Sequence, residues 1–105
     1  MSTVKSLSAT GVATGKHATL FGITVSSVID PLGTPPSGDV IFEIRDSAAA
    51  DGSGDIIARL LLTANGSSVN TLTFAGVRCG NGIAVNITNS SPEAHAAVVV
   101  SIEYE

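Results

Sequence analysis

The chain has 105 residues, of which 13% are charged and 44% are apolar, and its formal net charge is −4 at pH 7. A chain of this length forms one compact unit, so we expect residues 1–105 to make a single domain. Few, scattered basic residues argue against a groove that follows nucleic-acid phosphates. No apolar run approaches the roughly 20 residues that cross a bilayer, and no signal peptide is recognisable. We therefore expect synthesis in the cytoplasm, with no nucleic-acid or membrane partner.

The composition favours strands and turns over helices. Val and Ile together supply 20 positions and Gly plus Pro another 15, whereas Glu, Lys, Gln and Met are sparse. Residues 1–6 are small and polar, and we expect a flexible N-terminal arm there. From the N-terminus onward, the predicted strands are 6–13, 17–28, 39–46, 56–63, 68–74, 76–79, 83–89 and 95–104.

Segment 56–62 is the ambiguous one, because its apolar residues could cover one side of a short helix as easily as fill a strand. Asn65-Gly66 follows it, and this dipeptide suits a tight hairpin, which favours the strand. Between the second and third strands, the prolines of residues 30–38 predict a loop.

Short strands separated by turn signals every 8 to 12 residues or so indicate an all-β fold, either a sandwich or a small barrel, and we expect an antiparallel β-sandwich. We expect seven to eight short strands with jelly-roll or immunoglobulin-like connectivity. The core should consist of the residues that alternate toward one side of these strands. They are Phe21, Ile23, Val25, Val40, Phe42, Ile44, Leu60, Leu72, Phe74, Ile83, Val85, Ile87, Val98, Val100 and Ile102.

Candidate catalytic residues are few. Cys79 is the single cysteine, and His17 and His95 lie far from it in the sequence. A cysteine nucleophile needs a base within hydrogen-bond reach, whereas a buried structural cysteine needs only an apolar environment. The structural interpretation is favoured, and we predict no enzymatic activity and no catalytic residue.

Metal and carbohydrate sites are also weakly supported. Residues 51–55 place oxygen-bearing side chains at alternate positions, as a calcium loop does, with Asp46 nearby, but the bidentate Glu that completes such a loop is missing. A polar hairpin connection is favoured, and we expect neither metal nor cofactor. A carbohydrate site would need an exposed aromatic platform, and the three phenylalanines fall in the inward phase of their strands.

Some strand positions that should face water are apolar. Ile41, Ile57, Leu61, Ala97 and Val99 fall opposite the inward set, although a single sandwich has only one interior. Either strand twist and bulges shift the alternation locally, or other protein chains cover part of the outer surface, and coverage is favoured. The candidate interface residues are Ile41, Ile57, Leu61, Val99, Pro35 and Pro36.

The last feature is a resemblance carried by five segments, namely 38–46, 56–62, 72–78, 81–88 and 98–105. In these segments the chain resembles small β-rich virion proteins of tailed bacteriophages. The resemblance implies a non-enzymatic virion structural protein, with a capsid cement or decoration protein as the first expectation and a head-tail or tail component as the alternative. It further implies the major capsid protein or other virion proteins as partners, and the virion as location. The apolar outward faces predict a homo-oligomer, and threefold positions on capsids suggest a trimer.

Two other functions remain open. One is a glycan-binding β-sandwich module or adhesin that uses loops 30–38 and 46–55, because sandwich scaffolds carry function on their loops. The other is a small hydrolase that uses Cys79, His17 or His95, and this is the least favoured.

Overall fold

The structure is a computed structural model that describes residues 2–28, 39–62, 69–89 and 97–105. These residues form eight strands, and they contain no helix that could cross a membrane. The ambiguous segment 56–62 is a strand, as predicted. The strands are β1 (Thr3–Leu7), β2 (Gly11–Thr14), β3 (Ala18–Val28), β4 (Val40–Asp46), β5 (Asp55–Leu62), β6 (Val69–Cys79), β7 (Ile83–Asn89) and β8 (Ala97–Tyr104).

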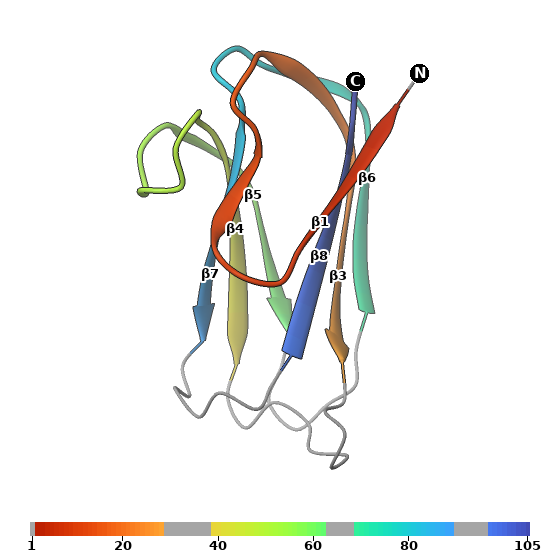
Figure 1. The fold of residues 1–105 in the computed structure, drawn as a ribbon. Coiled ribbons are helices and arrows are strands. Elements are labelled where there is room, and N and C mark those ends of the chain that lie inside the picture. Colours follow the sequence, from red (N-terminus) through yellow and green to blue (C-terminus); the bar gives the residue numbers. More distant parts are fainter. Residues whose placement is uncertain (1, 29–38, 63–68, 90–96) are drawn as a thin grey trace.

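The strands make two antiparallel sheets of four that pack face to face (Figure 1). Sheet A has the order β1-β8-β3-β6, and sheet B has the order β2-β7-β4-β5. The pairs are nested in the sequence, because β1 pairs with β8, β2 with β7, β3 with β6 and β4 with β5. This is the connectivity of a jelly roll, in which one long antiparallel ribbon doubles back and wraps into two sheets. The predicted antiparallel sandwich is confirmed, and its connectivity is the jelly-roll alternative.

Two predicted strand boundaries are wrong. The predicted strand 6–13 is in fact two strands, β1 and β2, which belong to different sheets. Most of the segment 1–6 expected as an arm belongs to β1, which pairs along its whole length with β8, from Thr3 opposite Tyr104 to Leu7 opposite Val100. Conversely, the predicted strands 68–74 and 76–79 are one continuous strand, β6, which passes through Gly76 at a φ of 127°.

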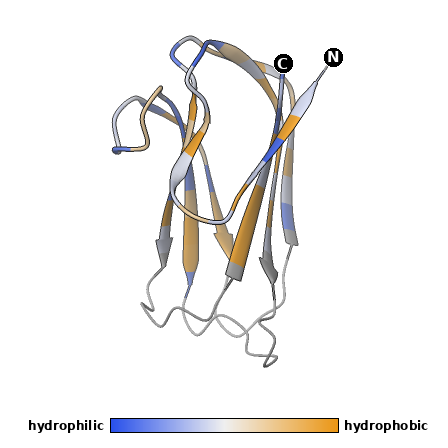
Figure 2. Ribbon diagram, viewed as in Figure 1, coloured by the Kyte–Doolittle hydropathy of each residue, from blue (hydrophilic) through white to orange (hydrophobic). Residues whose placement is uncertain are grey.

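The core lies between the two sheets, and the inward residues of β3, β4, β7 and β8 form most of it. Figure 2 shows how much of β4 and β8 is apolar. Most of the predicted core is buried, and Phe74 and Ile87 are half-buried against it. Leu20, Leu62 and Cys79 are buried as well, although they were not among the predicted core residues. Phe21 and Leu72 are the two predicted members that lie outside the core.

A β-bulge places Phe21 outside. Leu20 pairs with Tyr104 and Gly22 with Glu103, so Phe21 is an extra residue relative to β8. The bulge shifts the side-chain alternation by one position, which turns Leu20 inward. Leu72 is exposed for a different reason. It lies opposite the buried Ile23, but β6 is an edge strand, and the open edge leaves 38% of Leu72 accessible.

Candidate functional site

Three predicted interface residues lie on sheet B, and two of them are exposed as predicted whereas the third is not. Ile41 and Leu61 lie opposite each other on β4 and β5, and they are 42% and 46% exposed. Ile57 does not face outward, because the register of β4 and β5 shifts between Ile44 and Arg45 and leaves Ile57 as the extra residue, packed against the core. Its neighbour Ile56 takes the outward position instead.

The remaining predicted interface residues lie elsewhere. Val99 is half-buried on β8 and pairs with Ser26 of β3, so it belongs to sheet A rather than to the exposed pair on sheet B. Pro35 and Pro36 lie outside the described residues. The structure therefore brings together two of the six predicted residues, Ile41 and Leu61.

The exposed pair continues into a hollow of about 270 Å³ between the edge strands β5 and β6. Leu61 and Leu72 both line this hollow, together with Arg59 and Asn70. We call the set of Ile41, Leu61, Leu72, Arg59 and Asn70 the β5 edge surface. Its centre is apolar and its rim is polar, as in a protein interface.

Two polar contacts hold the rim of the β5 edge surface. The amide nitrogen of Asn70 donates a hydrogen bond to the backbone carbonyl of Leu61. That carbonyl belongs to an edge strand, and its engagement protects the edge from pairing with a foreign strand. Arg59 donates from Nε to Oε2 of Glu43 at 3.0 Å. These two contacts hold polar side chains beside the exposed leucines.

Glu43 organises the charges in the middle of the outer face of sheet B. Its carboxylate contacts Arg45 at 2.5 Å and Arg59 at 2.8 Å. Hydrogen bonds from Arg45 and then Arg59 lower the pKa of Glu43 below its ordinary value. Arg45 also donates to the backbone carbonyl of Gly54, which ties this cluster to the loop after β4. Charged groups are thus paired with one another where they border the exposed apolar side chains.

The outer face of sheet A has a different chemistry. It carries hydroxyl side chains in cross-strand contact, with Ser6 and Ser101 at 3.0 Å and Thr24 and Thr71 at 3.4 Å. A hollow of about 260 Å³ lies over Gly22, and Phe21 forms part of its lining. Sequence reasoning missed this hollow because strict alternation placed Phe21 inside. A glycine beside it in the middle of a strand was the available signal of a bulge.

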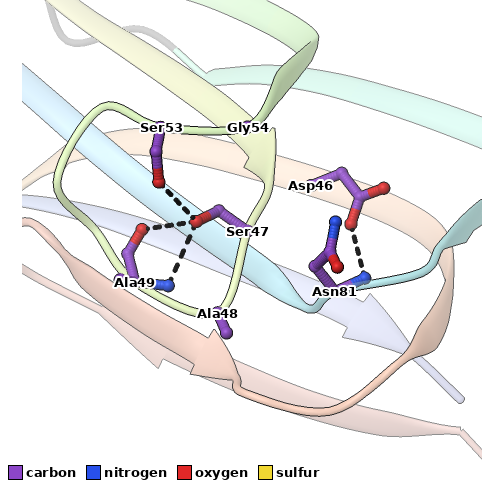
Figure 3. A pocket seen from close by; sticks show the side chains of 7 residues that line it. All are labelled: Asp46, Ser47, Ala48, Ala49, Ser53, Gly54 and Asn81. Atoms are coloured by element: carbon purple, nitrogen blue, oxygen red, sulfur yellow. Dashed lines mark hydrogen bonds between the residues drawn. The ribbon is translucent and has the colours of Figure 1, made fainter.

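The loop after β4 forms a third hollow, shown in Figure 3. The buried Ser47 hydroxyl donates to the carbonyl of Ala49 at 2.8 Å and accepts from the same residue's N–H at 3.1 Å. The carboxylate of Asp46 accepts from the backbone N–H groups of Gly80 and Asn81 at 3.2 and 2.8 Å. These contacts fix the loop to the start of β7.

Residues 51–55, the segment of this loop that resembles a calcium loop, form hydrogen bonds within the loop itself. Asp51 accepts hydrogen bonds from the N–H and the hydroxyl of Ser53, and these bonds lower the pKa of Asp51. Among the described residues, no three His, Cys, Asp or Glu side chains gather closely enough to hold a metal ion. The polar hairpin connection accounts for the pattern of residues 51–55.

The candidate nucleophile lies in the core. Cys79 is 1% exposed, and burial, reinforced by the charge of Asp46, raises the pKa of its thiol to about 11. A thiol with such a pKa is protonated at neutral pH and is a poor nucleophile. His17 precedes Ala18, the partner of Cys79 in the sheet, but His17 itself is exposed. His95 lies outside the described residues.

Comparisons of the chain with protein-family models, with curated proteins and with solved structures found no match. Function must therefore be inferred from the two outer faces, which differ in their exposed chemistry.

Proposed function

We propose that the protein is a non-enzymatic structural protein of a tailed-bacteriophage virion that binds the assembled capsid and cements neighbouring capsid subunits. The contact to the capsid is the β5 edge surface. The observation that carries this proposal is the exposure of Ile41, Leu61 and Leu72 on β4, β5 and β6, where the edges of the two sheets meet in a charge-poor chain. The resemblance of residues 38–46, 56–62, 72–78, 81–88 and 98–105 to small virion proteins supports the virion as its location.

The physical basis of cementing is preferential binding. A protein that binds only the assembled shell stabilises it by RT ln(1 + [L]/Kd) at each independent site, and a capsid has many equivalent sites. Leu61 and Ile41 point outward from neighbouring strands and can enter a pocket together. Burying such side chains contributes about 25 cal/mol for each Å² of apolar surface removed from water. Modest contacts repeated over a shell therefore add up to a large resistance to rupture.

A homo-oligomer, with a trimer as the specific proposal, would place several β5 edge surfaces on one capsid position. Apolar side chains that remain exposed in the single chain are favourable places for contacts between copies. Val99→Asp tests whether the outer face of β8 takes part in the contact between copies. If it does, sedimentation velocity should show dissociation with the β-sheet circular dichroism retained, and a variant that neither dissociates nor unfolds would remove Val99 from the interface.

The docking experiment uses capsids of the encoding phage that lack this protein. Wild-type protein, the double variant Ile41→Asp/Leu61→Asp and the control Ser6→Asp are each mixed with capsids and pelleted. Ser6 is exposed on β1, the edge strand of sheet A opposite β6, so its substitution places the same kind of charge away from the β5 edge surface. The wild type and the control should pellet with the capsids, whereas the double variant should stay in solution.

Heating then tests cementing itself. Capsids loaded with the wild type should release DNA at a higher temperature than bare capsids or capsids mixed with the double variant. Equal resistance of bare and loaded capsids to heat and osmotic shock would contradict the cementing role. Pelleting of the double variant at the wild-type level would contradict the role of the β5 edge surface.

A further inference from the structure

A second surface of the molecule has the features of a small-ligand site. It lies on the outer face of sheet A, where hollows of about 260 and 380 Å³ adjoin and share Phe21, Thr73 and Glu103 in their linings. Each hollow is close in size to the smaller pockets that hold organic ligands. We call this surface the β3 hollow.

Two features of the backbone create the β3 hollow. Gly22 lies on the central strand β3 and has no side chain, so the sheet surface is low at this point. The bulge at Phe21 turns an aromatic ring outward beside it. The edge of the ring also approaches Gly76, where an added Cβ would lie 3.5 Å from Phe21 Cε1. The ring therefore lies against Gly76 and forms an apolar wall of the hollow.

Hydrogen-bonding groups surround this wall. Glu103 projects over the low point, since a Cβ at Gly22 would lie 3.6 Å from its Oε1, and its Oε2 accepts a hydrogen bond from Ser2 at 3.0 Å. Hydroxyls of Thr24, Thr71 and Ser101 line the same hollow. Every hydroxyl has one donor and two acceptor positions, so the paired hydroxyls still have capacity for a ligand.

The charge of the lining selects the chemical class of that ligand. The described residues that line the two hollows include carboxylates but no lysine, arginine or histidine, which disfavours phosphates, sulfates and acidic sugars. A carboxylate together with several hydroxyls suits a ligand that presents many hydroxyl groups. The outward face of the half-buried Phe21 ring suits the apolar C–H face of such a ligand.

We infer that the β3 hollow binds a neutral saccharide, with the Phe21 ring against one sugar face and Glu103 accepting hydrogen bonds from sugar hydroxyls. This inference does not rest on the capsid proposal, because Phe21, Gly22 and Glu103 belong to β3 and β8, whereas the β5 edge surface belongs to β4, β5 and β6. The two surfaces adjoin at Thr71, which lines the hollows of both.

The test is saturation-transfer NMR of the full chain with neutral oligosaccharides, namely trimers of N-acetylglucosamine, mannose, galactose and glucose, and with sialyllactose as the acidic comparison. At least one neutral trimer should bind, and sialyllactose should bind more weakly than that trimer. Phe21→Ala and Glu103→Gln should each weaken binding by about tenfold or more, the effect of losing one good contact. No binding by any of the four trimers at roughly 10 mM, a concentration that detects even millimolar affinity, would overturn the inference.

A third variant keeps the test decisive should Phe21→Ala unfold. Gly22→Val fills the low point of the sheet, and the atoms nearest its Cβ lie at ordinary contact distances of 3.6 Å or more. The fold should be retained and trimer binding lost. Gly80→Ala is the matched control, because an added Cβ there meets nothing within 4 Å, and its binding should equal that of the wild type. Undiminished binding by folded Gly22→Val, or tighter binding of sialyllactose than of any trimer, would contradict the site.

Discussion

The outer faces of the two four-stranded sheets differ in surface chemistry, although each exposes large apolar side chains, Val4 on sheet A and Ile41 and Leu61 on sheet B. Sheet B presents the exposed Ile41–Leu61 pair next to a cluster in which Glu43 is ion-paired with two arginines. Sheet A presents cross-strand pairs of serine and threonine hydroxyls around a hollow. One face can lose water readily because its apolar side chains favour burial, whereas the other is suited to exchange hydrogen bonds with a polar ligand. One small jelly roll can thus support two kinds of recognition.

The difference arises from irregular points in the strands as much as from composition. The bulge at Phe21 moves an aromatic ring from the expected core to the outer face of sheet A. The register shift between Ile44 and Arg45 has the reverse effect on sheet B, since it draws Ile57 into the core and exposes Ile56. Each irregularity thus changes which side chain a face presents without changing the order of the strands.

The largest expected effect is a difference in stability between variants that truncate the inner Phe42 and the outer Phe21. Phe42→Ala should lower the free energy of unfolding by about 3–5 kcal/mol, because Phe42 is fully buried and its truncation leaves a cavity. Phe21→Ala should cost far less, about 1 kcal/mol, because the ring is partly in water. Urea unfolding followed by circular dichroism measures both values. Equal losses would place Phe21 in the core and remove the contrast between the faces.

A smaller expected effect is a loss of stability at alkaline pH, which tests whether the core between the two sheets excludes water from Cys79. The Cys79 thiol has an ordinary pKa of 9.0 in the unfolded chain and a pKa of about 11 in the native state. Between these pH values the unfolded chain binds fewer protons than the native one, so stability falls as pH rises. The loss should reach at most about 3 kcal/mol near pH 11.

Cys79→Ala provides the control for this alkaline loss, because tyrosine and lysine titrate in both proteins. Unfolding free energies of the two proteins, measured by urea at pH 8, 9, 10 and 11, should converge as pH rises. Parallel pH profiles would show that the thiol titrates normally and is accessible to water.

The smallest expected effect is the loss of stability when a surface carboxylate is removed, which we compare between Glu43 on sheet B and Glu103 on sheet A. The arginines lower the native pKa of Glu43 below its ordinary value of 4.5, so its contribution to stability is present above that value and is lost as pH falls through the native pKa. Glu43→Gln should therefore be less stable than the wild type at pH 7, and the difference should shrink below pH 4. Salt at about 0.5 M should also reduce it, because it screens exposed charges.

Glu103→Gln is the matched variant on sheet A, where the carboxylate accepts from the Ser2 hydroxyl instead of an arginine. Its effect on thermal unfolding should be smaller than that of Glu43→Gln and less sensitive to salt. The reverse ranking would show that the charge cluster on sheet B does not stabilise that face.

Regular strands were predictable from the sequence, and the irregular points were not. Alternation placed Val40, Phe42 and Ile44 in the core because β4 is regular there and its inward phase follows period two. The same rule failed at Phe21 and Ile57, since a bulge adds a residue without a local signal strong enough to reset the phase. For the candidate sites, exposure of Ile41 and Leu61 followed from the alternation. The β3 hollow depends on side chains of four strands, which only the folded register brings together.

Surface labelling with hydroxyl radicals, read by mass spectrometry, tests the central claim that the two faces have separate roles. Under the proposed capsid-binding function, the protein is labelled free and bound to capsids. Binding should protect Ile41, Leu61 and Leu72 on the β5 edge surface, while Phe21 and Val4 on sheet A stay as reactive as in the free protein. Protection of Phe21 and Val4 with unchanged labelling of Ile41 and Leu61 would contradict this claim.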